Sequence, residues 1–318
     1  MTLARRSRLV NLGRLPPALV ARLAEHYDLV TLAEQPEPAA YLKSHGAEFE
    51  AAVTSAAVGA NADVLNALPR LRVLSSFGVG LDKIDIAVAK TRGIAVGYTP
   101  DVLNDCVADA AFGLLIDVAR GFSAADRFVR RGDWPRGAYP PARKVSGARL
   151  GLVGMGRIGR TIAQRSTGFE MAVKYHARNP VAEVPWTFEA SLIDLARWAD
   201  FLVLITAGGA GTRHLVDAAV LDALGHEGFL VNVSRGSVVD EAALIKALSE
   251  GRIAGAGLDV FEHEPKVPAA LMAMDNVVLL PHVASNTRET RQVMADRVFD
   301  NLQSFLKDGR LLFPAPTP

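Results

Sequence analysis

The feature that most constrains the fold of this chain is a glycine motif placed between a short apolar run and an amphipathic segment. The stretch RLGLVGMGRIGR carries Gly154, Gly156 and Gly159 in the pattern G-x-G-x-x-G. The first glycine permits a tight turn, the second lets backbone approach a pyrophosphate, and the third lets a helix pack closely on a sheet. The first helical amides, including those of Arg157 and Ile158, would then face the phosphates.

The neighbouring sequence supplies the context that the motif needs. An apolar strand precedes the glycines, a helix is expected over Ile158–Thr167, and a second strand over Ala172–His176. This βαβ arrangement predicts a dinucleotide site rather than a glycine-rich turn in some other α/β protein.

The end of the second strand bears on which dinucleotide is bound. Sites specific for NAD place Asp or Glu about 20 residues beyond the glycines, on the ribose hydroxyls. Here His176 stands near that position, and no carboxylate lies between Met171 and Ala182. Arg178 follows, and a guanidinium pairs well with a 2′-phosphate. The sequence therefore predicts a preference for NADPH, with NAD possible as a cofactor and Arg178 pointing to solvent as the alternative.

Composition excludes several classes of partner. The 318 residues carry 35 Lys+Arg against 34 Asp+Glu, a net charge of +1, which gives no electrostatic case for nucleic acid or an anionic membrane. The single cysteine, Cys106, can form no internal disulfide, and no metal site is expected. No window approaches the roughly 18 apolar residues of a membrane span. The N-terminal apolar run is interrupted by Arg14, Pro16 and Pro17, unlike a signal peptide, so a cytoplasmic location is expected.

Strands and helices alternate on both sides of the motif, which predicts an α/β fold with parallel sheets. We expect a long apolar helix at Val102–Arg120, an irregular arm at 130–141 with Trp134 and Tyr139 in ordered contacts, and a final helix at Thr287–Leu306. The final helix would return to the first unit. The expected domains, both Rossmann-like or flavodoxin-like, are a substrate domain of residues 1–98 and 286–318 and an inserted nucleotide-binding domain of residues 99–285.

Three residue types that suit one reaction stand at the carboxyl ends of predicted strands, where open α/β sheets bind ligands. Arg235 offers a bidentate fork for a carboxylate. His282 can exchange a proton near neutral pH. A carboxylate beside the histidine would orient the ring and favour imidazolium, and both Glu262 and Glu264 are candidates. Reduction of a 2-oxo acid requires a group that holds the carboxylate, a hydride donor and a proton donor for the oxygen. The arginine, a nicotinamide and the histidine with its acid would supply these.

Four ordered motifs make the chain resemble a D-isomer-specific 2-hydroxyacid dehydrogenase over nearly its full length. They are Leu152–Gly159 and the segments VNVSRGSVVDE, GLDVFEHEP and PHVAS, which contain Arg235, Glu264 and His282. The resemblance implies that Arg235 binds the substrate carboxylate and carbonyl. It implies that His282 is the general acid/base and that Glu264, immediately before a proline, is its partner.

Further contacts follow from the same resemblance. Asp259 is similar to the family's contact to the nicotinamide carboxamide, and the segment SFGVGLD resembles the glycine loop of the substrate domain. The backbone amides of Val79 and Gly80 would then bind the substrate carboxylate. Other cofactor contacts are expected at strand ends, from Thr206, Val233 and Ser285.

Within the family, the segment Gly208–Leu215 resembles glyoxylate/hydroxypyruvate reductases, although Ala207 precedes it where many relatives carry a proline. The expected substrates are small 2-oxo acids, hydroxypyruvate or glyoxylate first. The resemblance also implies a homodimer through the nucleotide-binding domain, using Val102–Arg120 and the following arm. The alternatives are a D-3-phosphoglycerate dehydrogenase-like enzyme and another D-2-hydroxyacid dehydrogenase. The former is disfavoured because no regulatory domain is expected after the family core, and a formate dehydrogenase is less favoured still. A corepressor-like protein that senses NAD(H) is the non-enzymatic alternative.

Overall fold

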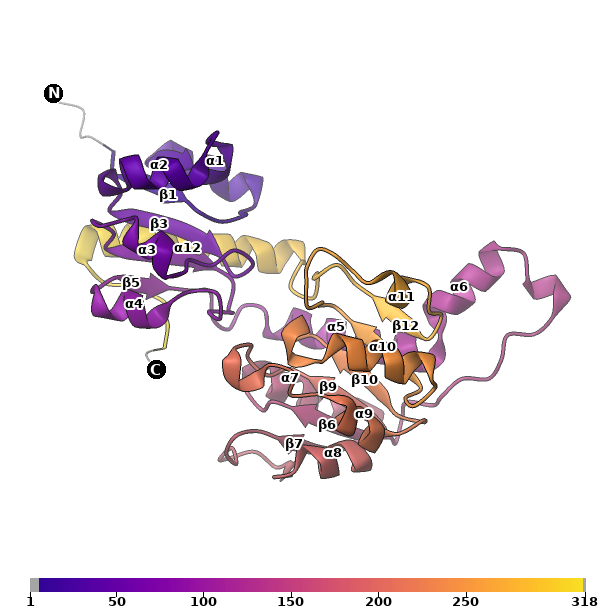
Figure 1. Ribbon diagram of the computed structural model, residues 1–318. Coiled ribbons are helices and arrows are strands. Elements are labelled where there is room, and N and C mark those ends of the chain that lie inside the picture. The colour runs from indigo at the N-terminus through magenta and orange to yellow at the C-terminus, as the bar shows by residue number, and fades with distance from the viewer. Residues whose placement is uncertain (1–5, 317–318) are drawn as a thin grey trace. The chain divides into compact units, whose positions relative to one another are not determined.

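The chain folds into two compact units, each built around its own parallel sheet (Figure 1). This computed structural model describes residues 6–316. Unit 1 comprises Met1–Val102 and Arg288–Pro318, and unit 2, Leu103–Thr287, is inserted between them. The expected α/β fold with two parallel sheets is confirmed. The first five residues of the N-terminal stretch compared above with a signal peptide lie outside the described residues.

The sheet of unit 1 has five strands in the order β2-β1-β3-β4-β5, all parallel. Every residue of β3 and β4 is buried, which explains why these strands read as continuous runs rather than alternating patterns. The strands are β1 (Arg8–Asn11), β2 (Asp28–Thr31), β3 (Ala51–Ser55), β4 (Val73–Phe77) and β5 (Ala95–Gly97).

Helices cover both faces of this sheet. The long C-terminal helix α12 (Arg288–Asp308) packs on β4 and beside α1 (Pro17–His26), so the end of the chain completes the first unit. The remaining helices are α2 (Pro38–His45), α3 (Ala62–Asn66) and α4 (Ile86–Thr91), with 3-10 turns η1 (Leu32–Glu34) and η2 (Gly46–Glu48). The side chains of Asn61 and Asp85 cap α3 and α4 by accepting backbone N–H bonds.

The sheet of unit 2 has seven parallel strands in the order β12-β11-β10-β9-β6-β7-β8. The strands are β6 (Arg149–Val153), β7 (Ala172–His176), β8 (Thr187–Phe188), β9 (Phe201–Leu204), β10 (Phe229–Asn232), β11 (Gly255–Leu258) and β12 (Val277–Leu279). The chain runs outward from β6 through β7 to β8, and then returns to β9 on the other side of β6. Open α/β sheets bind ligands at such a reversal, beyond the carboxyl ends of the strands.

Two helical layers enclose this second sheet. Helices α5 (Asn104–Arg120) and α7 (Arg157–Ser166) pack against each other, whereas α9 (Ala218–Leu224) packs between α8 (Leu192–Trp198) and α10 (Glu241–Ser249). The shorter elements are α11 (Ala269–Met272) and the 3-10 turns η4 (Thr167–Phe169), η5 (Ala210–Thr212) and η6 (Gly236–Val238). The apolar core between sheet and helices is continuous, from Leu195 on α8 to Val277 on β12.

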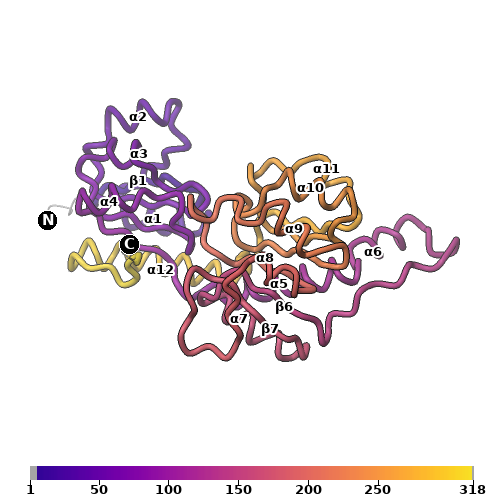
Figure 2. Tube along the Cα trace, turned by 60° about the horizontal axis from the view of Figure 1, so that its bottom comes forward, coloured from indigo at the N-terminus to yellow at the C-terminus, as the bar shows by residue number. Residues whose placement is uncertain are grey.

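An arm leaves the body of unit 2 between α5 and β6 (Figures 1 and 2). It contains α6 (Phe122–Arg130), which the sequence analysis missed, and the 3-10 turn η3 (Trp134–Arg136). Gly121, with φ +61°, ends α5 and lets the chain turn into α6. The α6 sequence is amphipathic, but none of its residues is buried, and its apolar side chains Phe122 and Val129 are exposed in the single chain.

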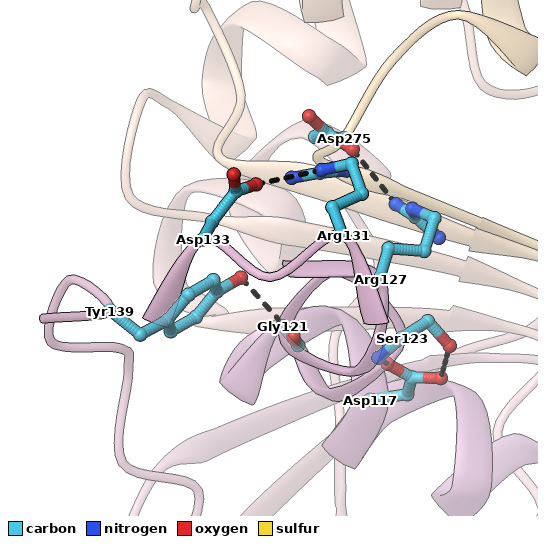
Figure 3. A network of polar contacts seen from close by, with 8 residues as sticks. All are labelled: Asp117, Gly121, Ser123, Arg127, Arg131, Asp133, Tyr139 and Asp275. Atoms are coloured by element: carbon cyan, nitrogen blue, oxygen red, sulfur yellow. Dashed lines mark hydrogen bonds and ion pairs between the residues drawn. The ribbon is translucent and has the colours of Figure 1, made fainter. Parts of the chain in front are cut away.

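Polar contacts hold the base of the arm in place (Figure 3). The Tyr139 hydroxyl donates to the Gly121 carbonyl at 3.2 Å, and Arg127 reaches Asp275 at 2.9 Å. The ordered contact expected for Tyr139 is therefore present. Trp134, by contrast, is 66% exposed in the single chain.

Residues 6–316 contain neither a membrane-spanning helix nor a cluster of metal-binding side chains. No helix there combines the length and apolar character needed to cross a membrane. No group of three or more His, Cys, Asp or Glu side chains in the same range is arranged to hold a metal ion.

Candidate functional site

The three motif glycines meet three different physical demands in the turn from β6 to α7. Gly154 has φ +112°, a backbone conformation that disfavours other residues. A Cβ on Gly159 would lie 2.4 Å from the Gly154 carbonyl oxygen, so only glycine allows this close packing. A Cβ on Gly156 would have no heavy atom within 4 Å. Gly156 therefore leaves open space at the start of α7, next to Arg157 and Ile158.

His176 and Arg178 lie at and just beyond the end of β7, the strand next to β6. The His176 Nδ1 atom contacts the Glu189 carbonyl oxygen at 3.1 Å, which fixes the ring against the neighbouring segment. Arg178 is exposed, and within residues 6–316 its guanidinium makes no hydrogen bond or ion pair. Its charge is therefore available to a ligand.

Thr206 and Val233 lie at the same edge of the sheet. Thr206 lies just beyond β9. The residue before it, Ile205, extends the pairing with β6, because its N–H donates to the Val153 carbonyl oxygen at 2.9 Å. Val233 is buried just beyond β10 and donates its N–H to the Leu204 carbonyl oxygen at 3.2 Å. The strand register therefore brings both to the edge that carries the glycine turn.

Arg235 is placed by a buried asparagine that the sequence analysis did not assign a role. The Asn232 Oδ1 atom accepts the Ser234 N–H at 3.0 Å and the Ser234 hydroxyl at 2.7 Å. Its Nδ2 donates to the Arg235 carbonyl oxygen at 3.0 Å. The loop after β10 is thus folded around the Asn232 side-chain amide. The position of Asn232 at the end of a predicted strand was the sequence signal that could have identified this role. Arg235 itself is half-buried, with Nη1 donating to the Ser234 carbonyl oxygen at 2.8 Å.

Asp259 organises the backbone that carries His282. Its buried carboxylate accepts the N–H groups of Val283 at 2.7 Å and Ala284 at 3.0 Å. Its carbonyl oxygen accepts the His282 N–H at 2.9 Å. Burial raises the pKa of Asp259, although these hydrogen bonds act in the opposite direction. The contact of Asp259 to a cofactor stays a prediction, as does that of half-buried Ser285, which follows in the same loop.

The histidine meets one of the two candidate acids directly. The His282 Nδ1 and Glu264 Oε2 atoms are 2.8 Å apart, and the side chains are 40% and 32% exposed. His282 has φ +55°, a conformation uncommon outside glycine and typical of functional sites. Within the described part of the chain nothing bonds to its Nε2, which leaves that nitrogen for proton exchange. Glu262 instead contacts Arg213 and His214.

Val79 and Gly80 lie in unit 1, directly after β4. The preceding Gly78 has φ +139°, and a Cβ there would approach that of Ala56 to 2.6 Å. Buried Thr99, which the sequence analysis did not single out, braces the loop: Gly78 donates its N–H to Thr99 Oγ1 at 3.2 Å. Within residues 6–316 the amides of Val79 and Gly80 donate no hydrogen bond, so they are available to an anion.

Comparison with known proteins gives matches along nearly the whole chain. A glyoxylate/hydroxypyruvate reductase from Arabidopsis thaliana is 44% identical over 292 residues, covering 92% of this chain and 93% of the relative. A hydroxyphenylpyruvate reductase from Plectranthus scutellarioides is 43% identical over 296 residues, covering 93% and 95%.

Solved structures agree. The structure of an NADPH-dependent glyoxylate/hydroxypyruvate reductase from Sinorhizobium meliloti, in complex with NADP and malonate, matches with a TM-score of 0.91 and 42% identity. The match covers 98% of this chain and 97% of that one. Residues 112–284 match the NAD-binding domain of the D-isomer specific 2-hydroxyacid dehydrogenases. The chain therefore belongs to the D-isomer specific 2-hydroxyacid dehydrogenase family, and it is an oxidoreductase with that family's NAD-binding domain.

Proposed function

We propose that this protein reduces small 2-oxo acids to D-2-hydroxy acids with NADPH, with hydroxypyruvate and glyoxylate as the preferred substrates. The observation that carries the proposal is the 2.8 Å contact of His282 with Glu264 at the carboxyl edge of the sheet that holds the glycine turn. The names of the relatives from Arabidopsis and Sinorhizobium support the choice of substrates.

The glycine turn fits a dinucleotide. The space that a Gly156 side chain would occupy is open, and the first amides of α7 border it. Exposed Arg178 suits the 2′-phosphate of NADPH, and no carboxylate stands between Met171 and Ala182 to repel that phosphate. The Sinorhizobium relative, named as NADPH-dependent and solved with NADP, supports the same preference.

In the proposed mechanism, Arg235 binds the substrate carboxylate and carbonyl oxygen through its planar fork and so orients the reacting carbon. The bound reduced nicotinamide supplies the hydride. His282 donates a proton from Nε2 to the carbonyl oxygen as negative charge develops there. Glu264 holds the ring at Nδ1, fixes its orientation and favours its protonated form.

We also propose the remaining assignments that follow from the family. Unit 2 is the nucleotide-binding domain and unit 1 the substrate domain, in which the free amides of Val79 and Gly80 bind the substrate carboxylate. The predicted cofactor contacts of Thr206, Val233, Asp259 and Ser285 belong to the same proposal.

A homodimer through unit 2 is part of the proposal. The arm exposes three large apolar side chains, Phe122, Val129 and Trp134, which a partner subunit would cover. The lone cysteine, Cys106, forms no internal disulfide, which suits a cytoplasmic enzyme.

A matrix of substrates and cofactors tests the proposed function. Glyoxylate, hydroxypyruvate, pyruvate, phenylpyruvate and 3-phosphohydroxypyruvate are each assayed with NADPH and with NADH. The highest kcat/KM is expected with hydroxypyruvate or glyoxylate and NADPH, and chiral products should be D. The Plectranthus relative makes an aromatic 2-oxo acid the second candidate, so preference for phenylpyruvate would change the substrate. Absence of turnover with every acid would instead favour a nucleotide-sensing protein.

A further inference from the structure

The two glutamates in the loop after β11 have separate partners. Glu264 contacts His282, whereas the Glu262 Oε1 atom accepts from Arg213 Nη2 at 2.8 Å and from His214 Nε2 at 3.0 Å. The residue between them, His263, is exposed. The loop is therefore attached to the protein at two points by side chains only two positions apart.

Side chains rather than a backbone ladder define the shape of this loop. The Phe261 N–H donates to Glu264 Oε1 at 3.2 Å, and the Glu262 N–H donates to Glu241 Oε2 at 3.2 Å. An irregular segment with so few backbone bonds takes its position from the contacts of its side chains. The contacts of Glu262 and of Glu264 therefore both contribute to the shape of the loop.

The partner of Glu262 is firmly fixed. The His214 N–H donates to the Ser237 carbonyl oxygen at 2.8 Å, and Val216 pairs with Val239 in a short parallel bridge. His214 has φ +50°, so its backbone is held in a conformation that few residues adopt. Because Ser237 follows closely after Arg235, the contact ties the glutamate loop to the segment that places the arginine.

Electrostatics also favours the ionised form of Glu262 at this contact. The Glu262 side chain is only 13% exposed. The hydrogen bond from His214 is the largest contribution to lowering the pKa of Glu262, and the hydrogen bond from Arg213 adds to it. Glu262 is therefore ionised at neutral pH, where its charge attracts both partners.

We propose that Glu262 and His214 are positioning residues that hold the 261–265 loop so that Glu264 meets His282. This inference rests on the proposed function, because it assigns Glu262 a role through the catalytic pair. At a catalytic pair such as Glu264 and His282, a displacement of about 1 Å costs on the order of a hundredfold in rate.

A double-mutant cycle tests the inference. Glu262→Ala should lower kcat for reduction on the order of tenfold, with the Kd for NADPH changed by less than about twofold. Glu262→Gln, which keeps an acceptor oxygen for His214, should recover most of the lost kcat. If Glu262 acts through Glu264, the Ala substitution should cost less than about twofold in a Glu264→Gln background. Independent, multiplying effects would overturn the inference.

A control and a second readout separate this inference from the proposed function. Glu250→Ala removes an ion pair with Arg252 in the same unit and should leave kcat unchanged. Amide hydrogen exchange of Phe261, measured without substrate, should become faster in Glu262→Ala and not in Glu250→Ala. Unchanged Phe261 exchange would refute the positioning role even if the enzyme turns over. Faster Phe261 exchange in Glu262→Ala, combined with a wild-type protein that reduces no 2-oxo acid, would support the positioning role and refute the proposed function alone.

Discussion

The Glu264 carboxylate lies 2.8 Å from the His282 Nδ1 atom, although 18 residues separate them in the chain. Glu264 follows β11 and His282 follows β12, neighbouring strands of one parallel sheet. Because parallel strands end at the same edge, the sheet itself brings acid and base together. Asp259 completes the arrangement by fixing the backbone of the histidine loop.

The charge of Glu264 should control the pH range of reduction. The reductive step needs protonated His282, and a neighbouring carboxylate favours that form. In wild type, kcat/KM should therefore hold at low pH and fall as the pH rises. In Glu264→Gln, which removes that charge, the fall should begin at lower pH. Measurement of kcat/KM from pH 5 to 10 checks this.

The same comparison has an internal control in the reverse reaction. Oxidation of the hydroxy acid needs neutral His282, so in Glu264→Gln it should extend to lower pH. His282→Ala should lower kcat about a hundredfold or more in both directions. A profile that does not move, or moves upward, in Glu264→Gln would show that Glu264 is not the partner of His282.

Arg235 should act on both binding and orientation of the substrate. Arg235→Lys keeps the positive charge but loses the planar fork. We expect a higher KM and a lower kcat together, with kcat/KM reduced about 10- to 100-fold by the loss of a charged hydrogen bond. Arg197→Ala, on an exposed ion pair of α8, should change neither constant. A KM effect with unchanged kcat would limit Arg235 to binding.

Two glycines of the motif should respond differently to alanine. Gly159→Ala places a Cβ 2.4 Å from the Gly154 carbonyl oxygen, so it should destabilise the fold by about 1–3 kcal/mol and lower Tm by several degrees. Gly156→Ala meets open space and should leave Tm unchanged. It should instead raise the Kd for NADPH about tenfold, equivalent to about 1.4 kcal/mol. Thermal melting and cofactor titration separate the two effects, and unchanged NADPH affinity in Gly156→Ala would count against the predicted phosphate site.

Arg178 should discriminate between the two nicotinamide cofactors. If its guanidinium pairs with the 2′-phosphate, Arg178→Ala should raise KM for NADPH about tenfold while leaving KM for NADH nearly unchanged, since NADH lacks that phosphate. The ratio of kcat/KM with the two cofactors measures the effect. No loss with NADPH would assign Arg178 to solvent, and equal losses with both cofactors would contradict a contact specific to the 2′-phosphate.

Asp200 should make unit 2 sensitive to acid. Its carboxylate is 12% exposed and accepts bonds from Arg149 Nη2 at 2.9 Å and Arg143 Nη2 at 3.1 Å. Burial acts to raise the pKa of Asp200, but the hydrogen bonds and charge of Arg149 outweigh it, so the pKa is lowered. A lowered pKa gives stability that is present above the unfolded value, about 3.9, and is lost as the pH falls through the folded value.

The corresponding variant gives the measurement. At pH 7, Asp200→Asn should lower the free energy of unfolding by about 1–3 kcal/mol, and the difference from wild type should shrink below about pH 4. Urea unfolding at several pH values checks this. Asp194→Asn, whose ion pair with Arg197 is exposed, should cost less than about 1 kcal/mol. A constant difference between Asp200→Asn and wild type down to pH 3 would contradict the assignment.

Local sequence patterns explain which helices could be predicted and which one was missed. The helix predicted at Val102–Arg120 is found at Asn104–Arg120, and the one at Thr287–Leu306 is found at Arg288–Asp308. Both have strong apolar periodicity or a long buried face. Helix α6 was missed although its sequence is amphipathic, because it is only nine residues long and directly follows α5 through Gly121.

The sequence by itself determined the fold class, the glycine turn and the residue types at the strand ends, because strand periodicity and the conformational freedom of glycine are local properties. It left Glu262 and Glu264 as rival acids on residue pattern alone. Only the tertiary structure showed the contacts of Glu264 with His282 and of Glu262 with His214, since they join loops that follow separate strands of the sheet. It alone also revealed the supporting roles of Asn232 and Thr99, because a buried polar side chain gains its meaning from the distant groups that satisfy its hydrogen bonds.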